Sequence, residues 1–150
     1  MHDAQIAGRS QAGSYAHGTT GEGAMSSKLY LTIASVLAIL YGIGFVLIPA
    51  KMGELYGVQP EPHAILNVQY FGSALLAWGV ILWFARDLDW AAVRGVLIGS
   101  VVGDAVGGLL SVWGISQGLV KAFGWTSVVI YVLLLLGGLY FLSTGSRKPA

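Results

Sequence analysis

The chain has 150 residues, of which 55% are hydrophobic and 10% are charged, and its mean hydropathy is +0.72. Soluble domains carry about a quarter charged residues, so this composition excludes an ordinary soluble domain and predicts an integral membrane protein. The net charge of +1 argues against nucleic-acid binding, and the lack of cysteine excludes disulfides, thiolate metal sites and cysteine nucleophiles.

Residues 1–27 form a polar segment rich in Gly, Ser and Thr. No hydrophobic period runs through it, and it holds too little apolar surface to offset the entropy of ordering, so we expect a flexible tail. The apolar run that follows is longer than the core of a signal peptide, which argues against a secretory signal. Met25 is an alternative translation start, and residues 146–150 make a short basic C-terminal end.

Between residues 28 and 145 lie four apolar spans, each near the length of about 20 residues that crosses a hydrocarbon core. The spans cover 29–48, 64–85, 91–113 and 125–142. Barrel strands would instead alternate in polarity over segments of about 10 residues. The connections are short, which makes neighbouring helices antiparallel, so we predict an all-α membrane protein with an up-down-up-down four-helix bundle.

The basic residues predict the orientation of these spans, because cytoplasmic loops are enriched in Lys and Arg. Lys51 and Lys121 flank one side, and the other six flank the side of both termini: Arg9, Lys28, Arg86, Arg94, Arg147 and Lys148. Both termini are therefore predicted to be cytoplasmic, in a multi-pass protein of a bacterial inner membrane. In the loop 50–63, the amphipathic stretch from Met52 to Tyr56 is expected to form a short helix along the membrane surface.

The third span carries small residues at every fourth position, including Gly95, Gly99, Gly103, Gly107 and Ser111. Membrane helices associate through close packing rather than hydrophobic burial, and small residues at this spacing let two backbones approach. We expect the row to pack helices within the bundle or between copies of the chain. The alternative is that the glycines open space for a ligand or a lipid.

Asp104 lies well inside the third span, where an unpaired charge is costly. At about 1.5 Å per residue, the polar residues expected near the same depth are Tyr41, Asn67, Gln69, Tyr70 and Tyr131. The favoured interpretation is a hydrogen-bond clasp between helices, because a proton relay ordinarily needs a second titratable group in the membrane interior. The alternative is an ion or proton site, or a polar pocket for a quinone or lipid headgroup.

Other polar residues predict little chemistry. His63 could ligate a metal with Glu61, but an imidazole at a membrane interface is ordinarily solvated, so we predict no metal site. The mixed-charge turn with Arg86, Asp87 and Asp89 suits a topology anchor with local ion pairs. The sequence contains no zinc-protease, nucleotide-loop, serine-hydrolase or haem-attachment motif, so no catalytic residue is assigned.

Three segments resemble a recurrent type of small bacterial four-helix membrane protein: LYGIGFVLIPAKMGELYGV (40–58), YFGSALLAWGVILWFARD (70–87) and SVVGDAVGGLLSVWG (100–114). More loosely, the helix number, the size and the Gly-rich spans are similar to the DoxX-like group. Some members of that group are associated with quinone-linked sulfur oxidation or oxidative-stress complexes. The resemblance implies no assigned catalytic residue.

The leading functional hypothesis is a non-enzymatic membrane protein that self-associates or serves as an accessory subunit of a larger membrane complex, with lipids and other subunits as partners. The second is a small transporter or an ion- or proton-conducting protein that uses Asp104. The third is a quinone-linked redox subunit in which Asp104, Tyr41 and Tyr131 line a headgroup pocket. No cofactor is required by the sequence, and a quinone or a lipid is the candidate ligand.

Overall fold

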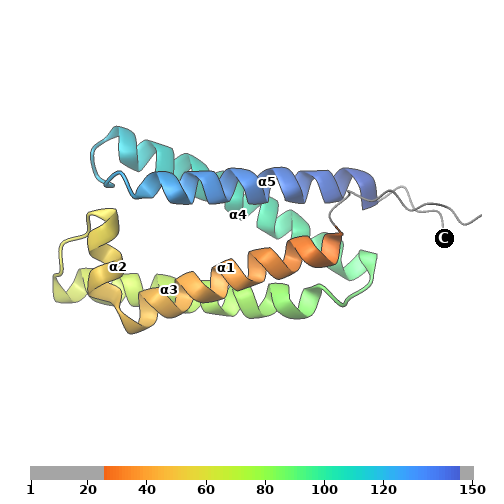
Figure 1. Ribbon diagram of the computed structural model, residues 1–150, viewed down its shortest axis with the longest axis horizontal. Helices are drawn as coiled ribbons and strands as arrows, with labels where there is room; N and C mark the ends of the chain where they lie inside the picture. Colours follow the sequence, from red (N-terminus) through yellow and green to blue (C-terminus); the bar gives the residue numbers. More distant parts are fainter. Residues whose placement is uncertain (1–25, 146–150) are drawn as a thin grey trace, which may run out of the picture.

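The computed structural model describes residues 26–145, and all regular structure in that range is helical. The four long helices are Ser27–Leu47 (α1), Pro62–Ala85 (α3), Trp90–Ser116 (α4) and Gly124–Gly145 (α5) (Figure 1). A short helix, Pro49–Tyr56 (α2), lies between the first two. The predicted all-α fold with four membrane-spanning helices is confirmed. Of the predicted tail, only Ser26 and Ser27 belong to the described residues, and the predicted basic C-terminal end lies outside them.

Polar residues outside the apolar runs explain why the helices extend a few residues beyond the predicted spans. The Ser26 hydroxyl accepts a hydrogen bond from the backbone N–H of Leu29 at 3.2 Å and begins α1. The Asp89 carboxylate accepts one from the backbone N–H of Ala92 at 2.9 Å and begins α4. Pro62 opens α3 in the first turn, where no backbone donor is needed.

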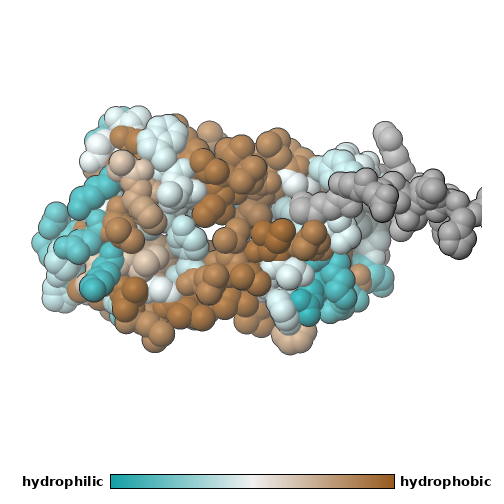
Figure 2. Space-filling view, viewed as in Figure 1, coloured by the Kyte–Doolittle hydropathy of each residue, from teal (hydrophilic) through white to brown (hydrophobic). Residues whose placement is uncertain are grey.

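The surface has the polarity of a membrane protein. Figure 2 shows mainly hydrophobic residues across the middle of the face in view and hydrophilic residues towards both ends. Large apolar side chains on all four long helices are exposed, among them Leu40, Phe84, Leu109 and Leu133. Each long helix has the length and hydropathy to cross a bilayer. The chain is therefore a multi-pass membrane protein.

The four long helices pair into two antiparallel hairpins, α1 with α3 and α4 with α5. Glycines let α1 and α3 approach closely, because a Cβ added to Gly42 would lie 2.9 Å from the carbonyl oxygen of Gly72. A Cβ on Gly79 would similarly lie 3.0 Å from the backbone nitrogen of Ile39. By contrast, α3 touches α4, and α1 touches α5, in only a few places.

The two hairpins meet in a buried cluster at the end of the molecule where α1 begins. We call this cluster the terminal core; it consists of Tyr30, Leu31, Ala34, Leu82, Val93, Leu97 and Phe141. The Tyr30 hydroxyl donates to the carbonyl oxygen of Leu134 at 2.7 Å, which ties α1 to α5. A Cβ on Gly137 would lie 2.5 Å from the Tyr30 ring, so that glycine makes room for the contact.

At the opposite end, α2 runs across the bundle and joins the two hairpins (Figure 1). The hydroxyls of Tyr56 and Ser127 lie 2.9 Å apart, and the Phe123 ring meets the Tyr56 ring edge-on at 5.2 Å. The backbone N–H of Lys121 donates to the Tyr56 carbonyl at 3.1 Å. Burial raises the pKa of the Tyr56 phenol above its usual value. We call these four residues the α2 clasp.

The helix expected over Met52 to Tyr56 is present and begins three residues earlier, at Pro49. It ends at Gly57, whose φ of 95° is a left-handed conformation that a glycine adopts without a steric penalty. This turn redirects the chain towards α3, so the position of α2 over the end of the bundle depends on it.

Candidate functional site

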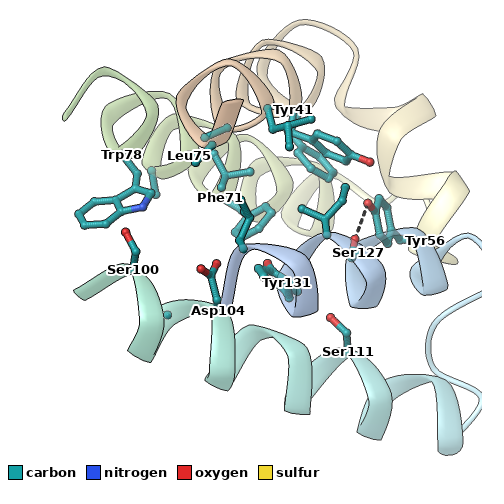
Figure 3. A pocket seen from close by; sticks show the side chains of 18 of the residues that line it. Tyr41, Tyr56, Phe71, Leu75, Trp78, Ser100, Asp104, Ser111, Ser127 and Tyr131 are labelled. Atoms are coloured by element: carbon teal, nitrogen blue, oxygen red, sulfur yellow. Dashed lines mark hydrogen bonds between the residues drawn. The ribbon is translucent and has the colours of Figure 1, made fainter. Parts of the chain in front are cut away.

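A cavity of about 840 Å³ lies between the two hairpins. Residues of the terminal core, such as Tyr30 and Leu82, line it at one end. Tyr56 and Ser127 of the α2 clasp line it at the other end (Figure 3). Its volume falls in the range of small-molecule sites, about 300–1,000 Å³. The cavity is therefore a candidate binding site inside the membrane-spanning part of the protein.

Most of the cavity wall is apolar. The α1–α3 hairpin contributes aliphatic and aromatic side chains, including Leu37, Phe71, Leu75 and Trp78, and α5 contributes Ile130, Tyr131 and Leu134. On α3, the lining residues recur at helical spacing and so occupy one face: Ala64, Asn67, Val68, Phe71, Ala74, Leu75, Trp78 and Leu82. Such a surface suits a molecule that is itself largely apolar.

The α4 wall is built from small residues, and this is where the glycine row lies. Gly99 and Gly103 line the cavity. A Cβ on Gly103 would meet nothing within 4 Å, and one on Gly99 would meet only the Trp78 ring, at 3.6 Å. The missing side chains at these positions therefore widen the cavity, as the alternative interpretation of the row requires. Ser111 also lines it, and its hydroxyl donates to the carbonyl oxygen of Gly107.

Packing within the chain, which we expected along the whole row, occurs mainly at Gly107. A Cβ there would lie 2.7 Å from the Tyr131 ring of α5, whereas one on Gly95 would meet nothing within 4 Å. The physical reason is that positions four residues apart drift by about 40° per step, so only one end of the row faces α5. Packing of the row between copies of the chain stays a prediction.

Asp104 lies midway along the α4 wall, and Figure 3 shows its carboxylate pointing into the cavity. Three of the predicted polar neighbours, Tyr41, Asn67 and Tyr131, line the same cavity. The predicted layer is wrong for the other two. Gln69 donates to the carbonyl oxygen of Val46 instead, and Tyr70 is 63% exposed. The sequence predicted only how deep these residues lie along the helix. Neither of them is on the face of α3 that lines the cavity.

The expected hydrogen-bond clasp around Asp104 is not formed. Within residues 26–145, no side chain or backbone group donates a hydrogen bond to the Asp104 carboxylate, and no Lys, Arg or His lines the cavity. The carboxylate therefore faces an apolar space without a partner from the described part of the chain. A charged carboxylate in this half-buried position is energetically costly unless it is protonated or a bound group compensates for it.

Ser100, one turn before Asp104, is a site residue that the sequence analysis did not single out. It is 6% exposed, it lines the cavity, and its hydroxyl has no hydrogen-bond partner among the described residues. Figure 3 shows the hydroxyl on the cavity side of α4, facing Trp78. The spacing of four residues from Asp104 is the signal that could have identified it, because such residues share a helix face.

The remaining polar residues lie away from the cavity. His63 and Glu61 are exposed, and residues 26–145 contain no group of three potential metal ligands. Lys28 of α1 donates to Asp87, in the turn between α3 and α4, at 2.6 Å. This bond holds the pKa of the exposed Asp87 carboxyl below its usual value. The Arg86 guanidinium stacks over the Trp83 ring at 3.5 Å. These contacts fit the predicted anchor.

No family model, curated protein or solved structure shows significant similarity to this chain. The likeness to small four-helix bacterial proteins and the DoxX-like group remains a hypothesis. Function is therefore inferred from the cavity and its surroundings.

Proposed function

We propose that this chain is a membrane protein that binds a lipid-soluble small molecule in the cavity between its two hairpins. The observation that carries the proposal is the cavity itself, which is large, mainly apolar and supplied with a single acid. The terminal core and the α2 clasp close its two ends, so the sparse contacts between the hairpins leave its sides as the route of entry from the bilayer.

Ligand binding is the step that the transporter hypothesis and the quinone-linked hypothesis have in common. Either function requires a site inside the membrane that holds a partly polar molecule. Asp104, Tyr41 and Tyr131 line the cavity and supply polar groups that could orient such a molecule. Transport would additionally require the two hairpins to open alternately at their two ends.

The proposal is tested by purifying the full chain in a mild detergent, extracting it with organic solvent and identifying retained molecules by mass spectrometry. Gly103→Leu should abolish retention, because its Cβ meets no neighbour and the added side chain occupies the cavity. Gly95→Leu is the matched control, since Gly95 lies on the same helix, is equally unobstructed and does not line the cavity. An empty wild-type protein, or equal retention by both variants, would refute the proposal.

A second candidate function is that of a self-associating or accessory subunit. The observation that favours it is the exposure of Gly95, over which a helix of another chain could pack closely. Chemical cross-linking in native membranes should then show an oligomer that Gly95→Leu disrupts and Gly103→Leu does not. Gly103→Leu is the test variant for binding and the control for association, and Gly95→Leu is the reverse. Binding and association are therefore tested separately.

We further propose that both termini face the cytoplasm of a bacterial cell. Lys28, Arg86 and Arg94 lie at the terminal-core end of the described chain, whereas Lys51 and Lys121 lie at the α2 end. Reporter fusions after residue 150 and within the α4–α5 loop should report opposite sides of the membrane. A cytoplasmic signal from the loop fusion would reverse the assignment.

A further inference from the structure

We infer that the molecule bound in the cavity is a lipophilic organic cation, with its positive group beside Asp104 and its apolar part against the α1–α3 wall. This inference rests on the proposed binding function and names the chemical class of its ligand. Its basis is the combination, in one cavity, of an unpartnered acid, several aromatic rings and a buried hydroxyl without a partner.

The charge of the cavity is the first argument. Among residues 26–145, Asp104 is the only charged side chain that lines the cavity, and no basic residue of this range lies opposite. A carboxylate in a membrane interior is ordinarily paired with a cation or with hydrogen-bond donors. The described chain supplies neither, so a ligand with a positive charge would complete the site, whereas an anion would be repelled.

The aromatic rings are the second argument. Trp78, Phe71, Tyr41 and Tyr131 line the cavity from three different helices. Aromatic faces attract organic cations, and the attraction is worth more in a site without water. The Tyr131 ring packs against Gly107, one turn from Asp104. Figure 3 shows this ring beside the Asp104 carboxylate. A side chain at position 107 would displace this ring.

Ser100 is the third argument and is independent of the other two. A buried hydroxyl without a hydrogen-bond partner carries an energetic penalty, and native proteins contain few of them. This one lies in the cavity wall one turn from Asp104. Its oxygen is covered in this conformation, and a rotation of the side chain would turn it towards the same positive group as the carboxylate. An entirely apolar ligand would leave both groups without a partner.

Two ions of the same shape and opposite charge, tetraphenylphosphonium and tetraphenylborate, test the inference. Each is titrated calorimetrically into the detergent-solubilised full chain, with the detergent alone as blank. Wild type should bind the cation at least about 30-fold more tightly than the anion, as expected for a buried charge pair. Asp104→Asn should weaken cation binding by a similar factor and remove the preference. Gly103→Leu should abolish binding, and Gly95→Leu should leave it unchanged.

The outcomes separate this inference from the proposed function. Equal binding of the two ions, or undiminished cation binding by Asp104→Asn, would overturn the cation and leave a binding cavity. Binding of neutral triphenylphosphine oxide or a quinone in preference to the cation would do the same. Failure of wild type to bind any of these probes, together with no retained molecule, would overturn both. Should Asp104→Asn not fold, the comparison of the ions on wild type and on Asp104→Glu decides.

Discussion

Two buried serines show how the same side chain can have opposite effects on stability. Ser35 donates to the carbonyl oxygen of Gly79 at 2.7 Å and so joins α1 to α3. Ser100 is also buried, but its hydroxyl has no partner among the described residues. The first hydroxyl contributes to helix packing, and the second is free to contribute to a ligand site.

We therefore predict different effects of replacing each serine by alanine. Ser35→Ala should lower the free energy of unfolding by about 0.6–1.7 kcal/mol, the range for hydrogen bonds between membrane helices. Ser100→Ala should leave the ligand-free protein unchanged or stabilise it by up to about 1 kcal/mol, because it removes an unpaired polar group. Unfolding in detergent, followed by circular dichroism, measures both. Destabilisation by Ser100→Ala as large as that by Ser35→Ala would show that the Ser100 hydroxyl is partnered.

The glycines also fall into two groups, those packed against a neighbouring helix and those that line the cavity. Gly42→Ala should destabilise the protein by about 1–3 kcal/mol, because the added Cβ would lie 2.8 Å from the backbone nitrogen of Leu76 and would push α1 away from α3. Gly103→Ala should be neutral or stabilising by up to about 1 kcal/mol, since it meets no neighbour and alanine favours the helix. Thermal unfolding of the two variants beside wild type gives the comparison, and similar losses in both would contradict the assignment.

At the scale of the elements, α2 connects the two hairpins. It lies between α1 and α3 in the chain, and its side chains contact the α4–α5 hairpin. The hydroxyls of Tyr56 and Ser127 form the direct side-chain link. We predict a coupling energy of about 0.6–1.7 kcal/mol in a double-mutant cycle of Tyr56→Phe and Ser127→Ala. Amide hydrogen exchange should also become faster in α2 in both single variants. Additive effects and unchanged exchange would mean that the contact does not hold the cavity closed.

The sequence was sufficient to predict the helices but not how they pair. Long apolar runs and prolines near the span ends predicted the five helices, and each predicted end lies within three residues of the observed one. The most regular small-residue pattern, on α4, suggested the main packing face. Yet the glycines at which the backbone of a neighbouring helix comes closest are Gly42, Gly72 and Gly79, on α1 and α3. A glycine permits a close approach without specifying the partner, so the pattern alone could not assign one.

The candidate site was predicted only in part, because the sequence gives the depth of a residue along its helix but not the direction in which the residue faces. Counting residues along each span placed Asp104, Tyr41, Asn67 and Tyr131 at one depth, and all four line the cavity. The same count included Tyr70, which faces outwards. Rotation about each helix axis and the separation of the hairpins depend on tertiary packing, and the cavity exists only because of that separation.

At the scale of the whole molecule, the protein is two hairpins held together near their two ends. The terminal core is apolar and buried, whereas the α2 clasp depends on one hydrogen bond between side chains, one aromatic contact and one backbone hydrogen bond. Between them the hairpins are separated by the cavity. Motion of one hairpin against the other should therefore be largest near the clasp, and a ligand that contacts both hairpins should reduce it.

Spin labels test this prediction directly, because the chain has no cysteine and any introduced pair is the only labelled one. Leu66 on α3 and Val112 on α4 are exposed near the α2 end and report on the separation of the hairpins. Leu47 and Leu66, also exposed, belong to one hairpin and serve as the control pair. We expect a broader distance distribution for the first pair than for the control.

Adding tetraphenylphosphonium should narrow the distribution between the hairpins and leave the control pair unchanged, because only a ligand that bridges both walls restricts their relative motion. Tyr56→Ala should broaden the first distribution further, since it removes the side-chain contacts of the clasp without touching the terminal core. Equal widths for the two pairs, insensitive to both changes, would show that the hairpins form one rigid bundle. In that case the cavity would be a fixed gap, and entry of a ligand from the bilayer would need another route.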